Sequence, residues 1–101
     1  APTRATITGT LKDRSGAVLN KRAYVRIYKA DKTDEPIGYD YVSSYDDGKY
    51  EFKCVPNGTY VIKAFDNESD KELATSATIT VTGANIVVDF PNLPIDNDPE
   101  Y

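Results

Sequence analysis

Apolar and polar residues alternate one by one in short runs along this chain, and this period of two restricts its fold more than any other feature. In the run RATITGTLK, threonines occupy one side and the other consists of Ala5, Ile7, Gly9 and Leu11. Successive side chains of a β-strand point to opposite faces of its sheet, whereas a helix repeats about every 3.6 residues. The run therefore predicts a strand with one buried face.

Further runs of this kind follow, separated by turn-forming residues. RAYVRIYK, KYEFKC and TYVIKAF place on one face Ala23, Val25 and Ile27, then Tyr50, Phe52 and Cys54, then Tyr60, Ile62 and Ala64. IGYDYVSSY alternates less cleanly and is typical of an edge strand, and LATSATITV and IVVDF each predict one more strand. About seven short strands without helical periodicity predict an all-β fold, an antiparallel Greek-key β-sandwich of the prealbumin-like or Ig-like type.

Two similar phrases, DDGKY and PNGTY, each open one of these strands. Gly48 and Gly58 can supply the positive φ that a tight reversal of the chain requires. The tyrosine that follows each glycine, Tyr50 or Tyr60, is predicted to close one end of the core beneath its turn.

A chain of 101 residues is long enough for one domain with its own core. We expect the β-sandwich to occupy residues 1–92. Residues 93–101 are acidic and contain proline, which is typical of a linker or tail that leads to a neighbouring domain.

Charge and residue types exclude several functions. The net charge is −4, which argues against nucleic acid and against an anionic membrane as partners. No apolar run is long enough for membrane insertion. Histidine is absent, which removes the usual zinc ligand and the side chain that most readily exchanges protons at neutral pH. We therefore expect a protein that is not an enzyme and that requires no cofactor.

The chain also resembles a known group of domains. The stretches ITGTLKDRSGAVLNKRAYVRIYK and SYDDGKYEFKCVPNGTYVIKAF are similar to carboxypeptidase regulatory-like domains, within the transthyretin-like and collagen-adhesin B-type sandwiches. The resemblance covers residues 5 to 90 and rests on Gly9, Gly16, Gly48, Tyr50, Phe52, Gly58 and Tyr60. It implies a non-catalytic module of a secreted or cell-surface bacterial protein.

One candidate binding surface is a stripe of aromatic and basic residues on the polar side of two strands. It consists of Tyr24, Arg26 and Tyr28, extended by Tyr39 and Tyr41. Tyrosine rings can stack on sugars or peptides, and arginine can bind hydroxyl or carboxylate groups. Ordinary cross-strand pairing on a solvated sheet explains the same pattern.

Two further kinds of site deserve a test. The collagen-adhesin relatives imply a lysine–asparagine crosslink, for which Lys12, Asn85 and Asn92 are the candidates, but alternation points Lys12 outward. The acidic loop could offer oxygen ligands for a weak calcium site from Asp66, Asn67, Glu68 and Asp70, although such residues are also common in turns.

Catalytic groups are scarce. Asp46, Asp47 and Glu51 lie close in sequence, but a small sandwich has little room for a cleft between two carboxylates. Ser43 and Ser44 have no histidine to activate them, and Cys54 is predicted to be a small buried hydrophobe.

The function that we expect is a structural spacer or accessory module, extracellular or at the cell surface, whose partners are neighbouring domains. The alternatives are a module that binds polysaccharide or an extracellular protein through the tyrosine and arginine face, and an adhesin-type or pilin-type repeat.

Overall fold

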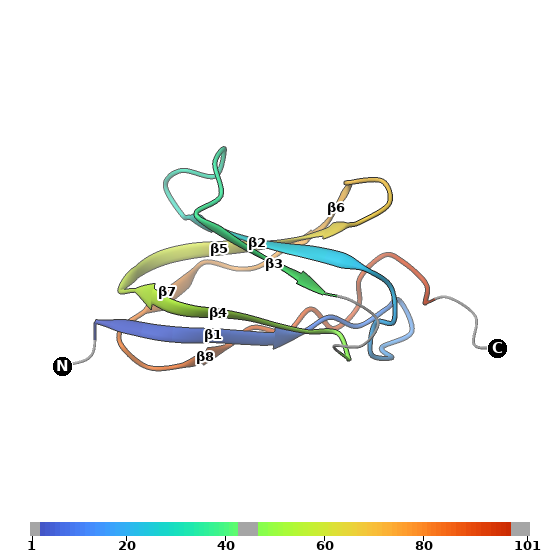
Figure 1. Cartoon of the computed structure of the whole chain (residues 1–101), viewed down its shortest axis with the longest axis horizontal. Helices are drawn as coiled ribbons and strands as arrows, with labels where there is room; N and C mark the ends of the chain where they lie inside the picture. Colours follow the sequence, from blue (N-terminus) through green and yellow to red (C-terminus); the bar gives the residue numbers. More distant parts are fainter. Residues whose placement is uncertain (1–2, 43–46, 98–101) are drawn as a thin grey trace.

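Two β-sheets pack face to face in the computed structural model, which describes residues 3–42 and 47–97 (Figure 1). Within those residues the strands are β1 (Arg4–Thr10), β2 (Ala23–Lys29), β3 (Gly38–Val42), β4 (Lys49–Pro56), β5 (Gly58–Asp66), β6 (Glu72–Thr75), β7 (Ile79–Val81) and β8 (Ile86–Val87). One sheet, here the β1 sheet, has the order β4-β1-β8. The other, the β2 sheet, has the order β3-β2-β5-β6, and β7 pairs with the beginning of β5.

The predictions of an all-β chain and of a β-sandwich are confirmed for the described residues. In residues 3–42 and 47–97 no helix has the length and apolar character of a membrane span. β3 lies at the edge of the β2 sheet, as its weaker alternation predicted.

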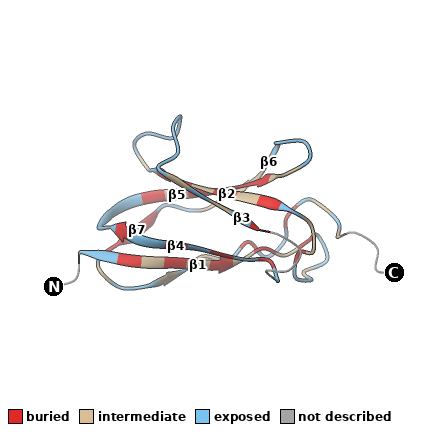
Figure 2. Cartoon of the chain, viewed as in Figure 1, coloured by how far each residue is buried: buried red, intermediate tan, exposed pale blue. Residues whose placement is uncertain are grey.

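The core lies between the facing sides of the two sheets (Figure 2). Ile7 from β1, Val25 from β2 and Ile62 from β5 are completely buried, as their alternation predicted. Removing one such aliphatic side chain from water contributes about 1.5–3 kcal/mol to folding. The period of two therefore identified the residues that hold the sheets together.

The direction and number of the strands differ from the prediction. β8 pairs with β1 in parallel, through Ile7 with Ile86 and Thr8 with Val87, so the sandwich is not purely antiparallel. Alternation predicts which face a residue occupies, but it carries no information on strand direction. The predicted strand LATSATITV is divided into β6 and β7, which pair with different parts of β5, and eight strands therefore replace seven in the described chain.

A β-bulge overturns the predicted burial of Cys54. Ala5 pairs with Val55 and Ile7 pairs with Phe52, so two residues of β4 lie opposite the single residue between Ala5 and Ile7. Cys54 adopts a φ of 58° at this bulge and its side chain is exposed. The extra residue reverses the alternation, and Val55 takes the buried position instead.

The two tyrosines that follow the glycine turns are buried, as predicted. The Tyr60 hydroxyl donates to the carbonyl oxygen of Pro56 at 2.6 Å, and the Tyr50 hydroxyl donates to the carbonyl oxygen of Val88. Burial, reinforced by the nearby charge of Asp89, raises the pKa of Tyr50. Tyr50 therefore keeps its proton and remains a donor.

The packed part of the chain continues past residue 92, the boundary expected from the sequence. Leu93 is buried in the core, and its N–H donates to the carbonyl oxygen of Lys12 at 3.0 Å. The Asn97 side chain accepts from the Asn20 N–H and donates to the Val18 carbonyl oxygen. Residues up to 97 thus belong to the domain, and residues 98–101 of the expected linker lie outside the described residues.

Gly9 is predicted to be the least replaceable glycine of the β1 sheet. A Cβ atom at Gly9 would lie 1.8 Å from the Val88 carbonyl oxygen and 2.6 Å from the Tyr50 ring. We expect Gly9→Ala to lower the free energy of unfolding by about 3 kcal/mol or more, because backbone and a buried ring must both move. Urea denaturation measures the loss.

Gly38→Ala is the matched control, since its Cβ would meet the Ile27 side chain at 3.3 Å. We expect a cost below about 1 kcal/mol there. Equal losses in the two variants would show that the Tyr50 contact does not restrict Gly9.

Candidate functional site

The outer face of the β2 sheet brings together most of the predicted aromatic and basic stripe. Tyr24 of β2 lies directly opposite Tyr41 of β3, and Arg26 lies opposite Tyr39. The rings of Tyr24 and Tyr41 meet edge to face with their centroids 5.3 Å apart. Such a pair contributes about 0.5–1.5 kcal/mol beyond the area that it buries, so it stabilises the sheet edge by itself.

Arg26 is engaged by its own domain. Its guanidinium carbon lies 4.5 Å from the centroid of the Phe65 ring, and Nη2 lies 3.6 Å from Oδ1 of Asp70. Phe65 faces the same side of the sheet from β5, opposite Tyr24 in the register. The charge of Arg26 is therefore already partly satisfied by an aromatic face and a carboxylate.

Tyr28 does not belong to an accessible surface, which corrects the prediction for this residue. Only 5% of Tyr28 is exposed. The Lys63 ammonium lies 5.4 Å from the centroid of the Tyr28 ring, and Lys63 Nζ is also 3.2 Å from Oε1 of Glu72. Long side chains of a neighbouring strand can cover a ring on an outer sheet face, and alternation alone cannot detect this.

Two tyrosines of the predicted stripe remain open to solvent. Tyr39 is 73% exposed and Tyr41 is 40% exposed, and both come from the edge strand β3. The accessible part of the stripe is therefore narrower than predicted and lies at the edge of the sheet.

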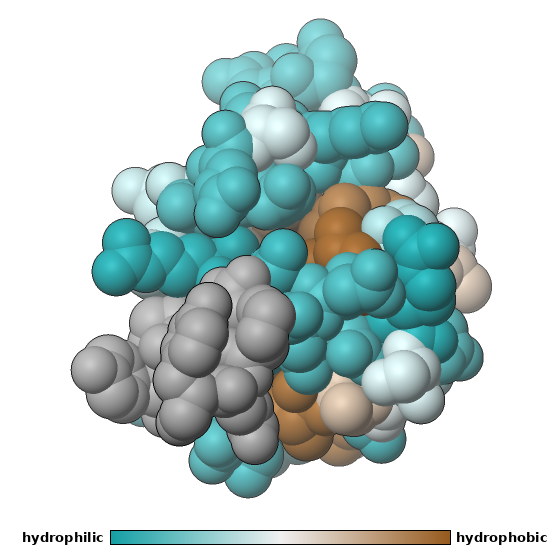
Figure 3. Space-filling model, turned by 90° about the vertical axis from the view of Figure 1, so that its right-hand side faces the viewer, coloured by the Kyte–Doolittle hydropathy of each residue, from teal (hydrophilic) through white to brown (hydrophobic). Residues whose placement is uncertain are grey.

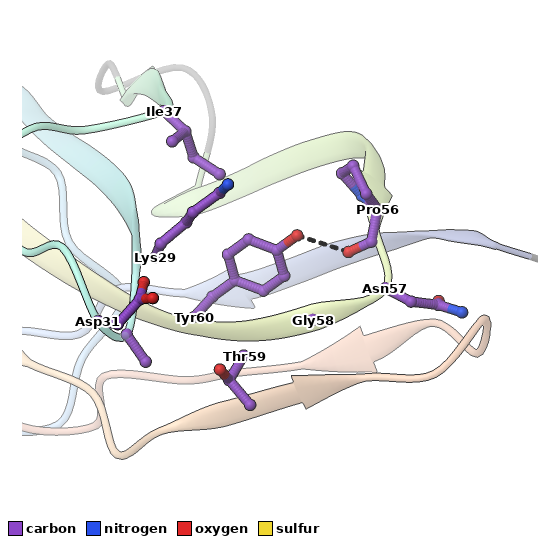
Figure 4. Close-up of a pocket in the computed structure, with 9 residues that line it drawn as sticks. Lys29, Asp31, Ile37, Pro56, Asn57, Gly58, Thr59 and Tyr60 are labelled. Atoms are coloured by element: carbon purple, nitrogen blue, oxygen red, sulfur yellow. Dashed lines mark hydrogen bonds between the residues drawn. The ribbon is translucent and has the colours of Figure 1, made fainter.

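A pocket that sequence reasoning missed lies at the end of the sandwich where the β2–β3 loop meets the β4–β5 turn (Figure 4). Its volume is about 760 Å³, and its lining includes Lys29, Asp31, Ile37, Asn57, Thr59 and Tyr60. The Tyr60 hydroxyl donates to the carbonyl oxygen of Pro56, and both residues line the pocket (Figure 4). Ala30, the first residue of the loop, donates from its N–H to the carbonyl oxygen of Thr59 near the beginning of β5 at 3.1 Å.

A second hollow adjoins this pocket along the open side of the sandwich, between β3 and β4. Its volume is about 300 Å³, and it shares Ile37 and Pro56 with the end pocket. Tyr39 lines it as well. The Glu51 N–H donates to Oδ2 of Asp40 at 2.9 Å, which joins the two strand edges there. We call the two hollows together the end groove.

The opposite end of the molecule, which faces the viewer in Figure 3, is mainly hydrophilic over its described residues, with small apolar patches. This end is therefore a polar surface, in contrast to the mixed lining of the end groove.

The predicted calcium residues serve the turn that contains them. Oδ1 of Asp66 accepts from the Glu68 N–H, and Oδ2 accepts from the Ser69 hydroxyl. Asp70 has a φ of 56° and pairs with Arg26. In residues 3–42 and 47–97, no three histidine, cysteine, aspartate or glutamate side chains gather in a geometry suited to a metal ion.

The residues considered for a crosslink lie apart from the core. Asn85 and Asn92 are exposed, and Lys12 is half-buried. The side-chain oxygen of Asn85 accepts from the Thr6 N–H at 3.0 Å. Of the residues considered for catalysis, Asp47 and Glu51 are exposed, whereas Ser43, Ser44 and Asp46 lie outside the described residues.

Asp13 is a buried carboxylate that sequence reasoning missed, although its place in DRSG is typical of an Asx turn. Its Oδ1 accepts from the Ser15 hydroxyl at 2.7 Å, the Ser15 N–H at 2.9 Å and the Ala17 N–H at 3.0 Å. The Ser15 hydroxyl, followed by these backbone donors, lowers the pKa of Asp13 below its usual value. Asp13 organises the loop on which the C-terminal segment packs.

Comparisons with known proteins support the fold. No protein-family model matches this chain, and no curated protein matches its sequence. A solved DUF3823 family protein from Bacteroides uniformis superposes with a TM-score of 0.57 at 16% identity, over 91% of this chain and 43% of that one. A Pseudomonas aeruginosa protein described as a proposed carbohydrate-binding protein gives a TM-score of 0.46 at 18% identity, over 87% and 89% of the two chains.

The first similarity shows a shared fold, and this chain spans less than half the length of that structure. Neither comparison confirms the expected kinship with carboxypeptidase regulatory-like domains, which stays a prediction.

Asp13 makes stability depend on pH in a defined direction. Because its pKa is lower in the folded state, its stabilising contribution is present above the unfolded pKa of about 3.9 and is lost as pH falls through the folded pKa. We expect Asp13→Asn to melt at a lower temperature than the wild type at pH 7, with the difference shrinking below about pH 4.

Melting curves between pH 7 and pH 3 provide the measurement, with the exposed Asp34→Asn as the control. A melting difference for Asp13→Asn that stays constant over this range would contradict the assignment.

Proposed function

We propose that this chain is a non-catalytic spacer or accessory domain that joins its neighbours in series within a larger secreted or cell-surface bacterial protein. The position of the chain ends carries the proposal. β1 starts at one end of the long axis, and the last described residues lie near the opposite end (Figure 1). The domain measures 49 × 25 × 18 Å, so a chain that enters and leaves in this way separates its neighbours along the longest dimension.

The exit of the chain is also firmly attached, as a spacer requires. Arg14 donates from Nη2 to the Pro94 carbonyl oxygen at 3.2 Å, and its Nε lies 3.5 Å from Oδ1 of Asp96. Together with the buried Leu93, these contacts set the direction in which the chain leaves the domain. A tandem, adhesin-like repeat would be one form of such a spacer.

The same proposal includes the Greek-key, prealbumin-like connection of the strands and an extracellular or cell-surface location, and it requires no cofactor. The neighbouring domains are the partners that it implies. Catalysis is not part of it, because the chain contains no histidine to exchange protons near neutral pH.

Energy transfer between two dyes tests the spacer geometry. In a Cys54→Ser background, we expect dyes at Thr3→Cys and Pro94→Cys to report a separation of about 30–35 Å, because the residues on either side of Pro94 are bonded to Lys12 and Arg14, about ten residues of extended chain from Thr3. The value should stay constant in urea until the domain unfolds cooperatively.

Dyes at Thr3→Cys and Ala84→Cys form the matched short pair, because the residue after Ala84 is bonded to Thr6 near the start of β1. If the Thr3–Pro94 pair reported as short a separation as this control, the series arrangement would be excluded.

The end groove favours a second function, a binding module for polysaccharide or an extracellular protein. Tyr39 offers an exposed ring for stacking, and Asp31, Asn57 and Lys29 supply acceptors and donors next to the apolar surface of Ile37. An apolar surface with a few polar groups that point into the same hollow is typical of sites for small organic ligands and sugars. The predicted face around Tyr24 and Tyr28 is less suitable, since Tyr28 is buried.

A glycan array with three proteins tests this function. For any glycan that binds the wild type, we expect Tyr39→Ala to weaken the affinity about tenfold, because one stacking ring is lost. Tyr41→Ala removes an exposed tyrosine of the same strand that does not line the groove, and we expect it to bind as the wild type does. Binding that survives Tyr39→Ala unchanged would exclude the groove.

A further inference from the structure

The first and last parts of the domain run side by side in the same direction. β1 pairs in parallel with β8, and a further parallel bridge joins Leu11 to Phe90. Residues 6–14 and residues 85–95 thus form one continuous contact, which we call the terminal seam. In Figure 1 the seam follows the long axis of the molecule.

Hydrogen bonds occur along the whole terminal seam. The backbone donors and acceptors are Val88 N to Thr8 O at 2.7 Å, Phe90 N to Thr10 O at 2.9 Å, Lys12 N to Phe90 O at 2.9 Å, Leu93 N to Lys12 O at 3.0 Å and Arg14 N to Ile95 O at 2.9 Å. The contact is therefore much longer than the two residues of β8.

Two N–H groups of β1 donate to side-chain oxygens of the C-terminal segment and not to its backbone carbonyl groups. Oδ1 of Asn85 accepts from the Thr6 N–H at 3.0 Å, and Oδ1 of Asp89 accepts from the Thr10 N–H at 2.9 Å. The two acceptors are four residues apart, and so are the two donors, as a parallel register requires. The side chains of Asn85 and Asp89 therefore supply two acceptors in a ladder whose other hydrogen bonds join backbone groups.

The seam is also fastened from its other side. β1 pairs with β4 on both sides of the bulge, and Tyr50 of β4 lies over Gly9 and donates to the Val88 carbonyl oxygen. Displacing residues 85–95 along β1 must therefore break the Tyr50 bond together with the ladder.

From this geometry we infer that the terminal seam is a mechanical clamp that resists tension applied through the two ends of the chain. Tension pulls the start of β1 towards one end of the long axis and pulls the segment after residue 95 towards the other. Because the two segments are parallel and adjacent, this force shears the seam and stretches its hydrogen bonds together. A force that separated them from one end would break the same bonds one after another. As a role in the cell, the clamp rests on the proposed spacer function, but the resistance itself is a property of the domain.

Single-molecule pulling in two directions tests the clamp. In the first, the domain is held by its two chain ends between marker domains. In the second, handles at Thr3→Cys and Ala84→Cys in the Cys54→Ser background open the seam from one end. Forced unfolding reports the unfolding rate. At equal force we expect this rate to be at least about twentyfold higher in the second direction, because end-to-end tension must break at least two ordinary hydrogen bonds at once. Equal rates in both directions would overturn the inference.

Side-chain variants test the residues of the seam. We expect Asn85→Ala and Asp89→Ala to raise the unfolding rate under end-to-end tension about fivefold each, the factor for one hydrogen bond. Asp89→Asn keeps an acceptor oxygen and should unfold at nearly the wild-type rate. Ser76→Ala is the matched control, because the Ser76 hydroxyl oxygen accepts from the Ile62 N–H at 2.9 Å, outside the seam.

Urea unfolding of the same variants separates mechanical from general effects. We expect Ser76→Ala to lower equilibrium stability by an amount similar to Asn85→Ala while leaving the rate under end-to-end tension within about twofold of the wild type. If Ser76→Ala raised that rate as much as Asn85→Ala, the seam would have no special part in mechanical resistance. The dye measurement of the end separation is independent of these rates, so the clamp and the spacer arrangement can fail separately.

Discussion

The contact of Tyr50 with Gly9 and Val88 connects the three strands on which the ends of this domain depend. Tyr50 comes from β4, its ring lies over Gly9 of β1, and its hydroxyl donates to the carbonyl oxygen of Val88 after β8. Burial keeps the hydroxyl protonated, so the donor is always present. The parallel seam, the buried Leu93 and the direction of the chain at its exit all follow from the C-terminal segment being held against β1.

The outer face of the β2 sheet shows how a polar surface can be occupied by its own side chains. Arg26 lies over Phe65 and pairs with Asp70, while Lys63 lies over Tyr28 and pairs with Glu72. Each cation therefore has both an aromatic face and a carboxylate within the domain. Cations that are paired in this way have fewer free donors for a ligand. The surface best suited to binding therefore lies at the edge of the sheet, at Tyr39, and not in its middle.

The sequence predicted those parts of the candidate sites that depend only on which face of a strand a residue occupies. The stripe of Tyr24, Arg26, Tyr39 and Tyr41 was placed on one face correctly, because adjacent strands with the same period must align their outward residues. The end groove was not predictable, since it requires the β2–β3 loop and the β4–β5 turn to meet in space. The bulge at Cys54 was missed for a related reason, because it is visible only in the register of β4 against β1.

Alternation by itself determined that the chain forms strands and which residues face the core, because burial of apolar side chains at every second position is decided locally along each strand. The glycine turns and their buried tyrosines, Tyr50 and Tyr60, were determined in the same way. Only the tertiary structure decided that β8 runs parallel to β1 and that the chain leaves at the opposite end from its start. Strand direction and pairing depend on contacts between residues about eighty positions apart, such as Thr6 with Asn85, and the pattern of a single strand contains no record of them.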